Sequence, residues 1–311
     1  MKIVTSHSVI PFLFLILTSS LIGCQDNTGE LPTRGTLVMI SPEDIYPVID
    51  KEVKAFDSLY QDAHITHLES TTRDAIVQLL NDSVKVVTSE RSFTDDEKAV
   101  IAKYKLQVDT FRVAYDAALV IVNEKNPMTQ VTVAELRDIM LGVATTWRKL
   151  GEPKVGGPIV VALGGPNTGM YGYVLQRVTE GKPFADVIHT CPTSLDVPAY
   201  VAAHVNAIGF ASQSWVREAP AGTRILAIGD PAYRRDSTST TLEYFWPYQA
   251  HVYRGYYPLR RTLYIFSKDV GNGVGVGFTA FVSGGAGQKI FLDNGLVPGT
   301  MKVTLVQSQS Q

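Results

Sequence analysis

From residue 34 onward, apolar positions recur along the chain with two different spacings. Short continuous apolar runs have strand character, and between them apolar residues recur every three or four positions, as on one face of a helix. The strand-like runs are 36–40, 64–69, 84–88, 111–123, 158–163, 206–212 and 260–268, and the helical segments are 41–56, 70–80, 94–104, 131–142, 193–204 and 276–295. This alternation predicts an α/β fold with parallel strands and right-handed crossovers.

Capping residues mark where several of these helices begin. The segment 41–44 (SPED) places a hydroxyl at the N-cap, proline at the first helical position and acids in the first turn, so the first helix is predicted to begin there. Thr94 with Glu97, and Thr132 with Glu135, have the spacing of capping boxes. Each of these pairs predicts a helix start.

Two strand-like runs, 111–123 and 260–268, are longer than the usual strand of about five or six residues. Long strands of this kind let a chain cross from one lobe to a second lobe and return. We therefore expect two α/β lobes with a cleft between them, the second lobe being inserted in the first. The predicted division assigns 35–115 and 260–311 to lobe I and 116–259 to lobe II.

The N-terminus has the pattern of an export signal. An apolar stretch at 9–24 follows Lys2, and it is too short and too interrupted to be an ordinary membrane helix. Its end, Leu-Ile-Gly before Cys24, resembles a bacterial lipobox, which predicts cleavage after 1–23, lipidation of Cys24 and a polar tether over 24–34. A simple secreted protein is the alternative. With Cys24 lipidated, Cys191 has no partner for an intrachain disulfide.

Composition excludes several classes of function. The chain is 45% hydrophobic and 19% charged with a net charge of −2, as in a globular protein, and it lacks the basic face that nucleic-acid binding needs. The sequence has no G-x-S-x-G elbow and no H-E-x-x-H motif, and the glycines of 271–278 do not follow a dinucleotide-binding pattern. His64 with His67, and His189 with Cys191, are poor metal sets. We expect no enzyme, no metal and no cofactor.

Polar residues follow several of the predicted strands at the points where helices begin. In a parallel sheet these ends share one edge, where helix N-termini offer N–H donors to an anion. Acids at the same edge would repel a fully ionised anion, but they can accept a hydrogen bond from an anion that carries a proton, as phosphate does near neutral pH. The polar residues are Ser41, Ser70, Thr71, Thr72, Asn167, Thr168 and Gly169, and the acids are Glu43, Asp44, Glu69 and Glu90. For each hydroxyl, a purely structural capping role is the alternative.

Four segments resemble the solute-binding proteins of bacterial ABC phosphate importers. They are 117–151 with its "LRDIMLG" helix and Trp147, 205–212 (VNAIGFAS), 257–268 (YPLRRTLYIFSK) and 287–298 (GQKIFLDNGLVP). The resemblance covers nearly the whole mature chain in the family's order. It implies a type II periplasmic-binding-protein fold that closes on an oxyanion by a hinge, with phosphate and an ABC permease as partners. A lipid-anchored monomer at the periplasmic or extracellular face of a membrane is expected.

The resemblance also implies positions for the ligand contacts. They fall at Ser41, among Ser70, Thr71 and Thr72, at Glu90, and at Thr168-Gly169-Met170.

The chain departs from the family pattern at two positions. An arginine that the family places near Gly164 is absent, and Met170 replaces a hydroxyl residue. We expect Arg91 or Arg73 to supply the missing positive charge, with a solvated surface arginine as the alternative for each. The open alternatives for function are a different ligand or a sensor role on the same fold, and an exported hydrolase.

Overall fold

The computed structural model describes residues 31–301 except 215–219, 237, 239 and 270. The predicted signal peptide, Cys24 and most of the tether lie outside the described residues. The strands are β1 (Gly35–Pro42), β2 (Ala63–Ser70), β3 (Val86–Ser89), β4 (Asp109–Asn123), β5 (Gln130–Thr132), β6 (Val160–Gly164), β7 (Ile188–Cys191), β8 (Ala207–Ser212), β9 (Thr223–Ile225), β10 (Ala227–Gly229), β11 (Tyr244–Phe245), β12 (Arg260–Ser267) and β13 (Val297–Pro298).

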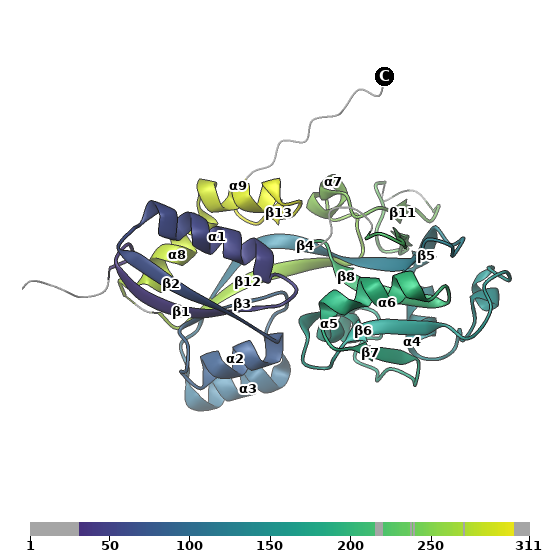
Figure 1. The fold of residues 1–311 in the computed structure, drawn as a ribbon, viewed down its shortest axis with the longest axis horizontal. Coiled ribbons are helices and arrows are strands. Elements are labelled where there is room, and N and C mark those ends of the chain that lie inside the picture. The colour runs from purple at the N-terminus through teal and green to yellow at the C-terminus, as the bar shows by residue number, and fades with distance from the viewer. Residues whose placement is uncertain (1–30, 215–219, 237, 239, 270, 302–311) are drawn as a thin grey trace, which may run out of the picture.

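Helices pack around these strands in both halves of the molecule (Figure 1). They are α1 (Tyr46–Leu59), α2 (Thr72–Leu80), α3 (Asp95–Tyr104), α4 (Val133–Met140), α5 (Gly169–Arg177), α6 (Val197–Ala203), α7 (Gln249–Tyr253), α8 (Val274–Ser283) and α9 (Gly285–Asp293), with 3-10 turns η1 (Trp147–Leu150) and η2 (Ser194–Asp196). Among the described residues, no helix is long and apolar enough to cross a membrane.

The long strand β4 joins the two halves, as Figure 1 shows. Its first part, up to Ala117, pairs with β12, and its second part, from Ala118, pairs with β8. The strand order is β2-β1-β3-β12-β4-β8-β6-β7, with β13 and β9 also paired to β4. The prediction of a long strand shared between lobes is therefore confirmed for β4.

The expected parallel pairing holds only in part. The pairs β1–β2, β1–β3, β6–β7 and β6–β8 are parallel, whereas β12 runs antiparallel to β3 and β4, and β4 runs antiparallel to β8. The all-parallel prediction is wrong for β4 and β12 because these strands carry the chain from one half to the other and back, which reverses its direction.

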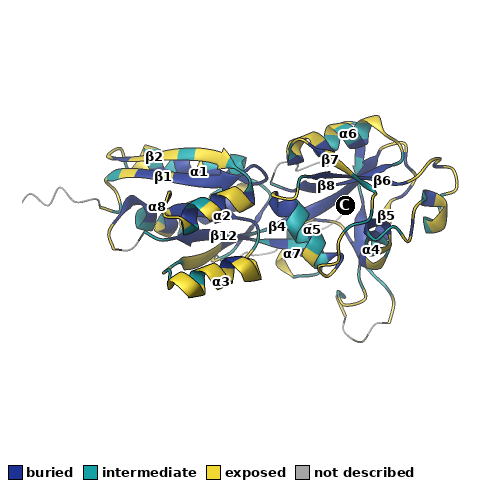
Figure 2. Cartoon of the chain, turned by 90° about the horizontal axis from the view of Figure 1, so that it is seen from below, coloured by how far each residue is buried: buried dark blue, intermediate teal, exposed yellow. Residues whose placement is uncertain are grey.

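Buried side chains form separate cores in the two halves (Figure 2). One cluster draws its members from 117–259 and Val297. A second is built from 37–114 and 263–296, and a smaller third from 40–87 and Phe266. On β4 the second core ends at Ala114 and the first begins at Ala117, and near the start of β12 the first core ends at Leu259 and the second resumes at Leu263. The junction between the halves therefore lies where these two strands pair.

Most predicted helix starts agree with the structure, but the first does not. The capping boxes Thr94–Glu97 and Thr132–Glu135 both form. Helix α1 begins at Tyr46 and not at Ser41, because Ser41 and Pro42 extend β1 and pair with the end of β2. The predicted helix 276–295 is divided into α8 and α9 at Gly284, which has extended backbone geometry.

Candidate functional site

The two halves touch where the carboxyl ends of β1, β3 and β6 meet. The Arg73 N–H donates to the Asn167 carbonyl at 3.2 Å, and the Ser194 N–H donates to Glu43 Oε1 at 2.8 Å. Beside these contacts lies a groove of about 670 Å³, lined by residues of both halves that include Arg73, Glu90, Arg91, Asn167, Thr168, Tyr171, Arg260 and Arg261. In Figure 1, α2 of one half and α5 of the other lie on either side of the junction between the halves.

The carboxyl of Glu90 occupies the centre of this contact region. Glu90 follows β3, is 1% exposed, and accepts a hydrogen bond from Thr72 Oγ1 at 2.9 Å through Oε1. It packs directly on the first residue of α5, since a Cβ added to Gly169 would lie 1.7 Å from Glu90 Oε1. The second oxygen, Oε2, has no hydrogen-bond partner among the described residues. A carboxyl from one half thus lies against a helix N-terminus of the other.

Burial, together with the negative charge of the neighbouring Asp44, raises the pKa of Glu90 to about 7. The positive charge of Arg261 and the hydrogen bond from Thr72 act in the opposite direction. Glu90 therefore exchanges its proton near neutral pH, where most glutamates are fully ionised.

Arg261 brings a guanidinium group into the same region. It is 1% exposed, its Nε and Nη2 donate to Asp116 Oδ2, and Nη1 donates to Asp44 Oδ2 at 3.2 Å. Nη2 also donates to Ser212 Oγ at 2.8 Å, and Nη1 lies 3.9 Å from Met170 Sδ in the first turn of α5. The guanidinium is thus bound by residues of both lobes and lies against the start of α5.

Sequence reasoning missed Arg261, although a signal for it was present. On β12, Arg261, Leu263 and Ile265 alternate with more exposed neighbours, so Arg261 occupies a core-facing position. Asp116 lies directly opposite it on β4. A charged residue at a buried strand position is unusual enough to indicate a paired or functional group.

Gly164, near which the resemblance leads one to expect an arginine, is closely surrounded by side chains. A Cβ added to Gly164 would lie 2.8 Å from Ser194 Oγ and 3.1 Å from Thr168 Oγ1. A side chain at this position would have to displace Ser194, and Arg261 brings a guanidinium from a different strand. Met170, which replaces a hydroxyl residue, is buried against that guanidinium.

The predicted contact Ser41 is engaged within lobe I. Its Oγ lies 2.7 Å from His67 Nε2 and accepts from Thr88 Oγ1 at 2.7 Å. The other ring nitrogen of His67 is 3.7 Å from Asp50 Oδ1, and Tyr46 stacks on the ring. Burial lowers the pKa of His67 to about 4 despite the opposing effect of Asp50, so the ring is neutral at physiological pH. Ser41 is thus oriented by a neutral histidine.

The hydroxyls that follow β2 have separate roles. Ser70 ends the strand, and Thr71 is the N-cap of α2, accepting from the Asp74 N–H at 3.3 Å. Only Thr72 reaches the interlobe region, where it binds Glu90. Of these three candidates, the structure brings Thr72 to the site.

The start of α5 offers donors to the interlobe region. Thr168 caps the helix, accepting from the Tyr171 N–H at 3.3 Å and donating to the Gly165 carbonyl at 2.8 Å. The N–H groups of Gly169 and Met170 make no hydrogen bond to another described residue. Such free N–H groups at the positive end of a helix form an anion site.

The two arginines predicted to supply positive charge differ in their surroundings. Arg91 is held by both oxygens of Glu97 at 2.8 Å and by the Ser92 carbonyl at 2.9 Å. Arg73 is exposed, and its side chain makes no hydrogen bond to another described residue. Both line the groove. Arg91 packs near Gly172 of α5, and Arg261 lies against Met170 in the first turn of the same helix. The role of Arg73 and Arg91 toward a ligand stays a prediction.

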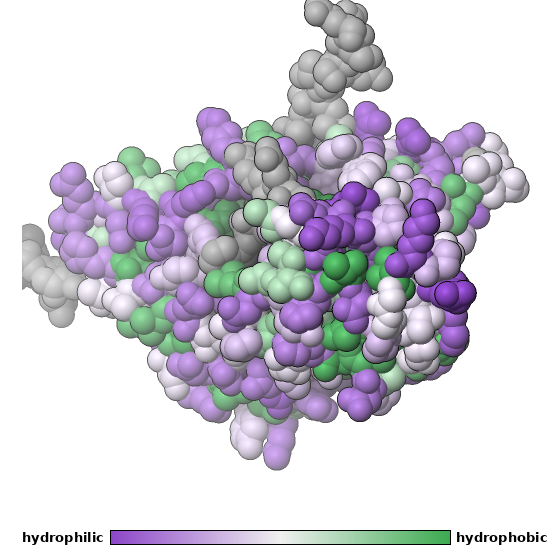
Figure 3. All heavy atoms as spheres, turned by 45° about the vertical axis from the view of Figure 1, so that its right-hand side comes forward, coloured by the Kyte–Doolittle hydropathy of each residue, from purple (hydrophilic) through white to green (hydrophobic). Residues whose placement is uncertain are grey.

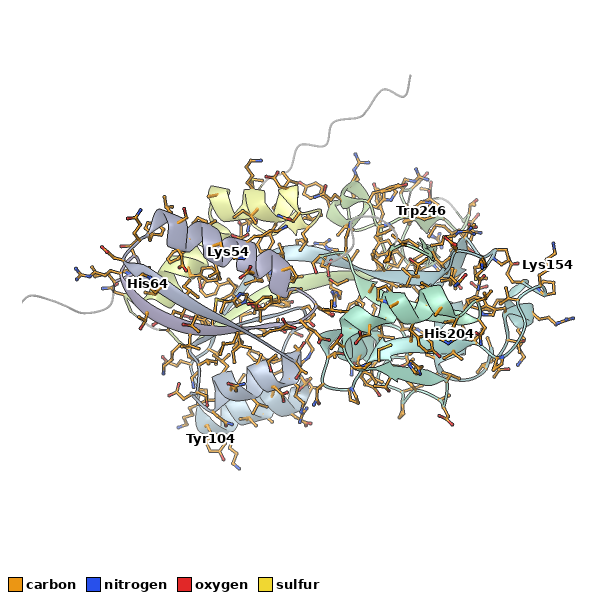
Figure 4. All side chains as sticks on the ribbon, viewed as in Figure 1. Lys54, His64, Tyr104, Lys154, His204 and Trp246 are labelled. Atoms are coloured by element: carbon orange, nitrogen blue, oxygen red, sulfur yellow. The ribbon has the colours of Figure 1, made fainter. Side chains whose placement is uncertain are left out.

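The two pairs weighed as metal ligands lie on different strands. His64 and His67 are on β2, and His189 and Cys191 are on β7; the side chain of His64 is labelled in Figure 4. His189 stacks on Tyr200, and Cys191 is a buried free thiol. Within the described part of the chain, no group of three or more His, Cys, Asp or Glu side chains could hold a metal ion.

A two-lobed α/β fold joined by shared strands, with helix N-termini and a buried arginine between the lobes, defines a periplasmic-binding-protein architecture. The family model of the PBP superfamily domain matches residues 26–284, so the chain belongs to this superfamily. The resemblance inferred from the four segments is thereby confirmed.

Curated relatives and a solved structure agree with this assignment. The chain is 23% identical to Protein SphX of Synechococcus elongatus and 25% identical to the phosphate-binding protein PstS of Borreliella burgdorferi, over 53% and 47% of its length. These matches span about half the length of each relative, 50% and 48%. A Clostridium perfringens protein described as a phosphate ABC transporter substrate-binding protein, solved with bound phosphate, superposes with a TM-score of 0.70 at 20% identity. That superposition covers 85% of this chain and 99% of the other, and it establishes the type II fold.

Proposed function

We propose that the chain binds phosphate, or a closely similar oxyanion that can carry a proton, between its lobes and delivers it without catalysis to an ABC importer. The observation that carries this proposal is the position of the Glu90 carboxyl. This group is itself an oxyanion, and it is buried against Gly169 with Thr72 and Arg261 beside it. The names of the relatives, which include phosphate-binding proteins, support phosphate as the ligand.

The donors around Glu90 suit a tetrahedral oxyanion. The N–H groups of Gly169 and Met170 lie at the positive end of α5, and Thr72 Oγ1 and Arg261 Nη1 approach from the other side. When phosphate enters, its oxygens take the N–H groups and the Thr72 hydroxyl, and Glu90 accepts a hydrogen bond from a protonated ligand oxygen. Lobe contact excludes water from these bonds and strengthens them.

The lobes move relative to each other about the strands that join them. We infer the division made from the sequence, 35–115 with 260–311 against 116–259, because the hydrophobic cores change over close to residues 115 and 260. Hinge motion at β4 and at the start of β12 would open the groove and admit the ligand.

The protein is proposed to act as a lipoprotein at the periplasmic or extracellular face of a membrane. This rests on the sequence of residues 1–34, with cleavage before Cys24 and lipid on its thiol. A monomer is proposed because the family resemblance implies one. On the face in Figure 3, hydrophobic residues are interspersed with hydrophilic ones.

Calorimetric titration of the full-length protein, kept in detergent, with phosphate and then with sulfate tests this function. Saturable phosphate binding at one site per chain, with much weaker sulfate binding, is the expected result. No heat with either anion over the pH range 6 to 9 would refute oxyanion binding, and equal affinity for both would refute the preference for a protonated anion.

A further inference from the structure

Acidic side chains outnumber basic ones in the buried region between the lobes. Four carboxyls lie there, and each is at most 9% exposed: Glu43, Asp44, Glu90 and Asp116. Arg261 is the only arginine or lysine that is buried among the described residues. With every carboxyl ionised, this region would carry a net charge of −3 before any anion entered it.

The cluster also has more hydrogen-bond acceptors than hydrogens to occupy them. Oε2 of Glu90 and Oδ1 of Asp116 are buried and have no donor among the described residues. Buried polar atoms are nearly always satisfied in native proteins, and an unpaired one is destabilising. Because Glu90 lies against α5, a hydrogen for its Oε2 can come from a ligand bound at that helix or from protonation of the carboxyl itself.

Charges from each neighbouring element bear on Glu90. Asp44 raises its pKa, and Arg261 on β12 lowers it. Arg73 of α2 is exposed to solvent, which screens its charge. Arg91 is neutralised by Glu97, and the first turn of α5 contributes no charged side chain. One guanidinium therefore offsets the charge of the cluster, and a doubly charged anion would add to an existing excess of negative charge.

We propose that oxyanion binding at this site is coupled to the uptake of a proton, so that singly charged phosphate is the effective ligand. This inference rests on the proposed function. Hydrogen phosphate and one proton combine with the protein in which Glu90 is ionised, and together they form the complex. The added proton lies either on a phosphate oxygen that donates to Glu90 Oε2 or on Glu90 itself. Both placements hold the same number of protons and give the buried cluster the same charge.

The linkage between phosphate binding and proton uptake sets how strongly the phosphate affinity should depend on pH. Above the pKa of Glu90, a complex that takes up one proton loses affinity about tenfold for each pH unit. At pH values well below 7, Glu90 is protonated before the ligand arrives, and phosphate itself is largely singly charged. The two free partners then carry one proton more than the complex, so binding releases a proton and the affinity should fall again below pH 7.

The test is calorimetric titration of the full-length protein with phosphate at pH 6, 7, 8 and 9. Each titration is repeated in two buffers that differ in their heat of ionisation. At pH 8 we expect uptake of about one proton per phosphate and, from pH 8 to pH 9, an affinity loss of about tenfold. Equal or tighter binding at pH 9 without a buffer-dependent heat would overturn proton coupling and leave phosphate binding intact.

Two variants make the test specific to Glu90. Glu90→Gln has the charge of the protonated carboxyl, so its phosphate affinity should change less than about threefold between pH 7 and pH 9. Glu69→Gln removes an exposed carboxylate near the end of β2 and should keep the wild-type pH profile. An unchanged tenfold slope in Glu90→Gln would overturn the assignment to Glu90. Absence of phosphate binding in the wild type at every pH would overturn the proposed function itself.

Discussion

Arg261 and Asp116 lie directly opposite each other on β12 and β4, and neither side chain is more than 1% exposed. The pair sits where the hydrophobic cores of the two lobes change over, and Ser212 of β8 hydrogen-bonds to both members. The same guanidinium reaches Asp44 in lobe I and the sulfur of Met170 in lobe II. The junction of the lobes and the candidate site therefore share one buried arginine.

Arg261→Met should lower the free energy of unfolding by about 3–5 kcal/mol, because Asp116 and Asp44 would remain buried without their cation. Urea unfolding measures the change. Combining Arg261→Met with Asp116→Leu should recover part of the loss, giving a coupling energy of about 1–3 kcal/mol. Strictly additive effects of the two substitutions would mean that the pair is energetically independent.

Gly169→Ala should weaken phosphate binding at least tenfold, because the new Cβ would lie 1.7 Å from the present position of Glu90 Oε1 and would fill the space of a ligand oxygen. Gly172→Ala in the same helix is the matched control. Its Cβ meets Arg91 Cδ at an ordinary 3.7 Å, so it should keep the affinity and add about 0.5–1 kcal/mol of stability. Calorimetric titration separates the two, and full affinity in Gly169→Ala would place the ligand elsewhere.

Arg73→Ala and Arg91→Ala should have different effects. The Arg73 side chain is exposed in the groove, so its removal should reduce phosphate affinity about two- to fivefold at low salt and less at high salt. Arg91 is bound to Glu97, so its removal should cost about 1–3 kcal/mol of stability and change affinity less than twofold. Phosphate titrations at two salt concentrations measure the affinities, and urea unfolding measures the stabilities. Loss of binding in Arg91→Ala alone would show that Arg91 contacts the ligand.

His67 should make the protein less stable as the pH falls. Its folded pKa is about 4 against 6.5 for an unperturbed histidine, so the unfolded chain binds the proton first. The stability contribution is complete above pH 6.5 and is lost as the pH falls toward 4, by up to about 3 kcal/mol. His67→Phe keeps a ring to stack on Tyr46 and removes this titration, so its free energy of unfolding should fall less over the same range. Parallel curves for the two proteins would contradict the assignment.

Local sequence patterns predicted those parts of the fold that depend on neighbours in the chain. The capping boxes, the length of β4 and the strand–turn–helix whose helix begins at Thr168-Gly169 are all fixed by residues a few positions apart. The start of α1 could not be read in this way, because Pro42 stays in β1 through its pairing with Ser70 of another strand.

The candidate site depended more on long-range contacts than its motifs indicated. Arg260 and Arg261 are adjacent and chemically identical, and only the register of β12 against β4 buries the second of them beside Asp116. The sequence placed Glu90 and Gly169 at the site through the family resemblance, but their direct contact joins segments 79 positions apart in different lobes. The engagement of Arg91 by Glu97 could not be separated from a ligand role without coordinates.

The most direct test of oxyanion binding between the lobes is a crystal structure of the full-length protein with arsenate, in which the anomalous signal of arsenic locates the anion. We predict one strong peak at the first turn of α5, within hydrogen-bonding distance of the Gly169 N–H and Thr72 Oγ1, with the Glu90 carboxyl displaced from Gly169. A peak elsewhere, or a Glu90 carboxyl still resting on Gly169 with arsenate bound at another place, would contradict the account.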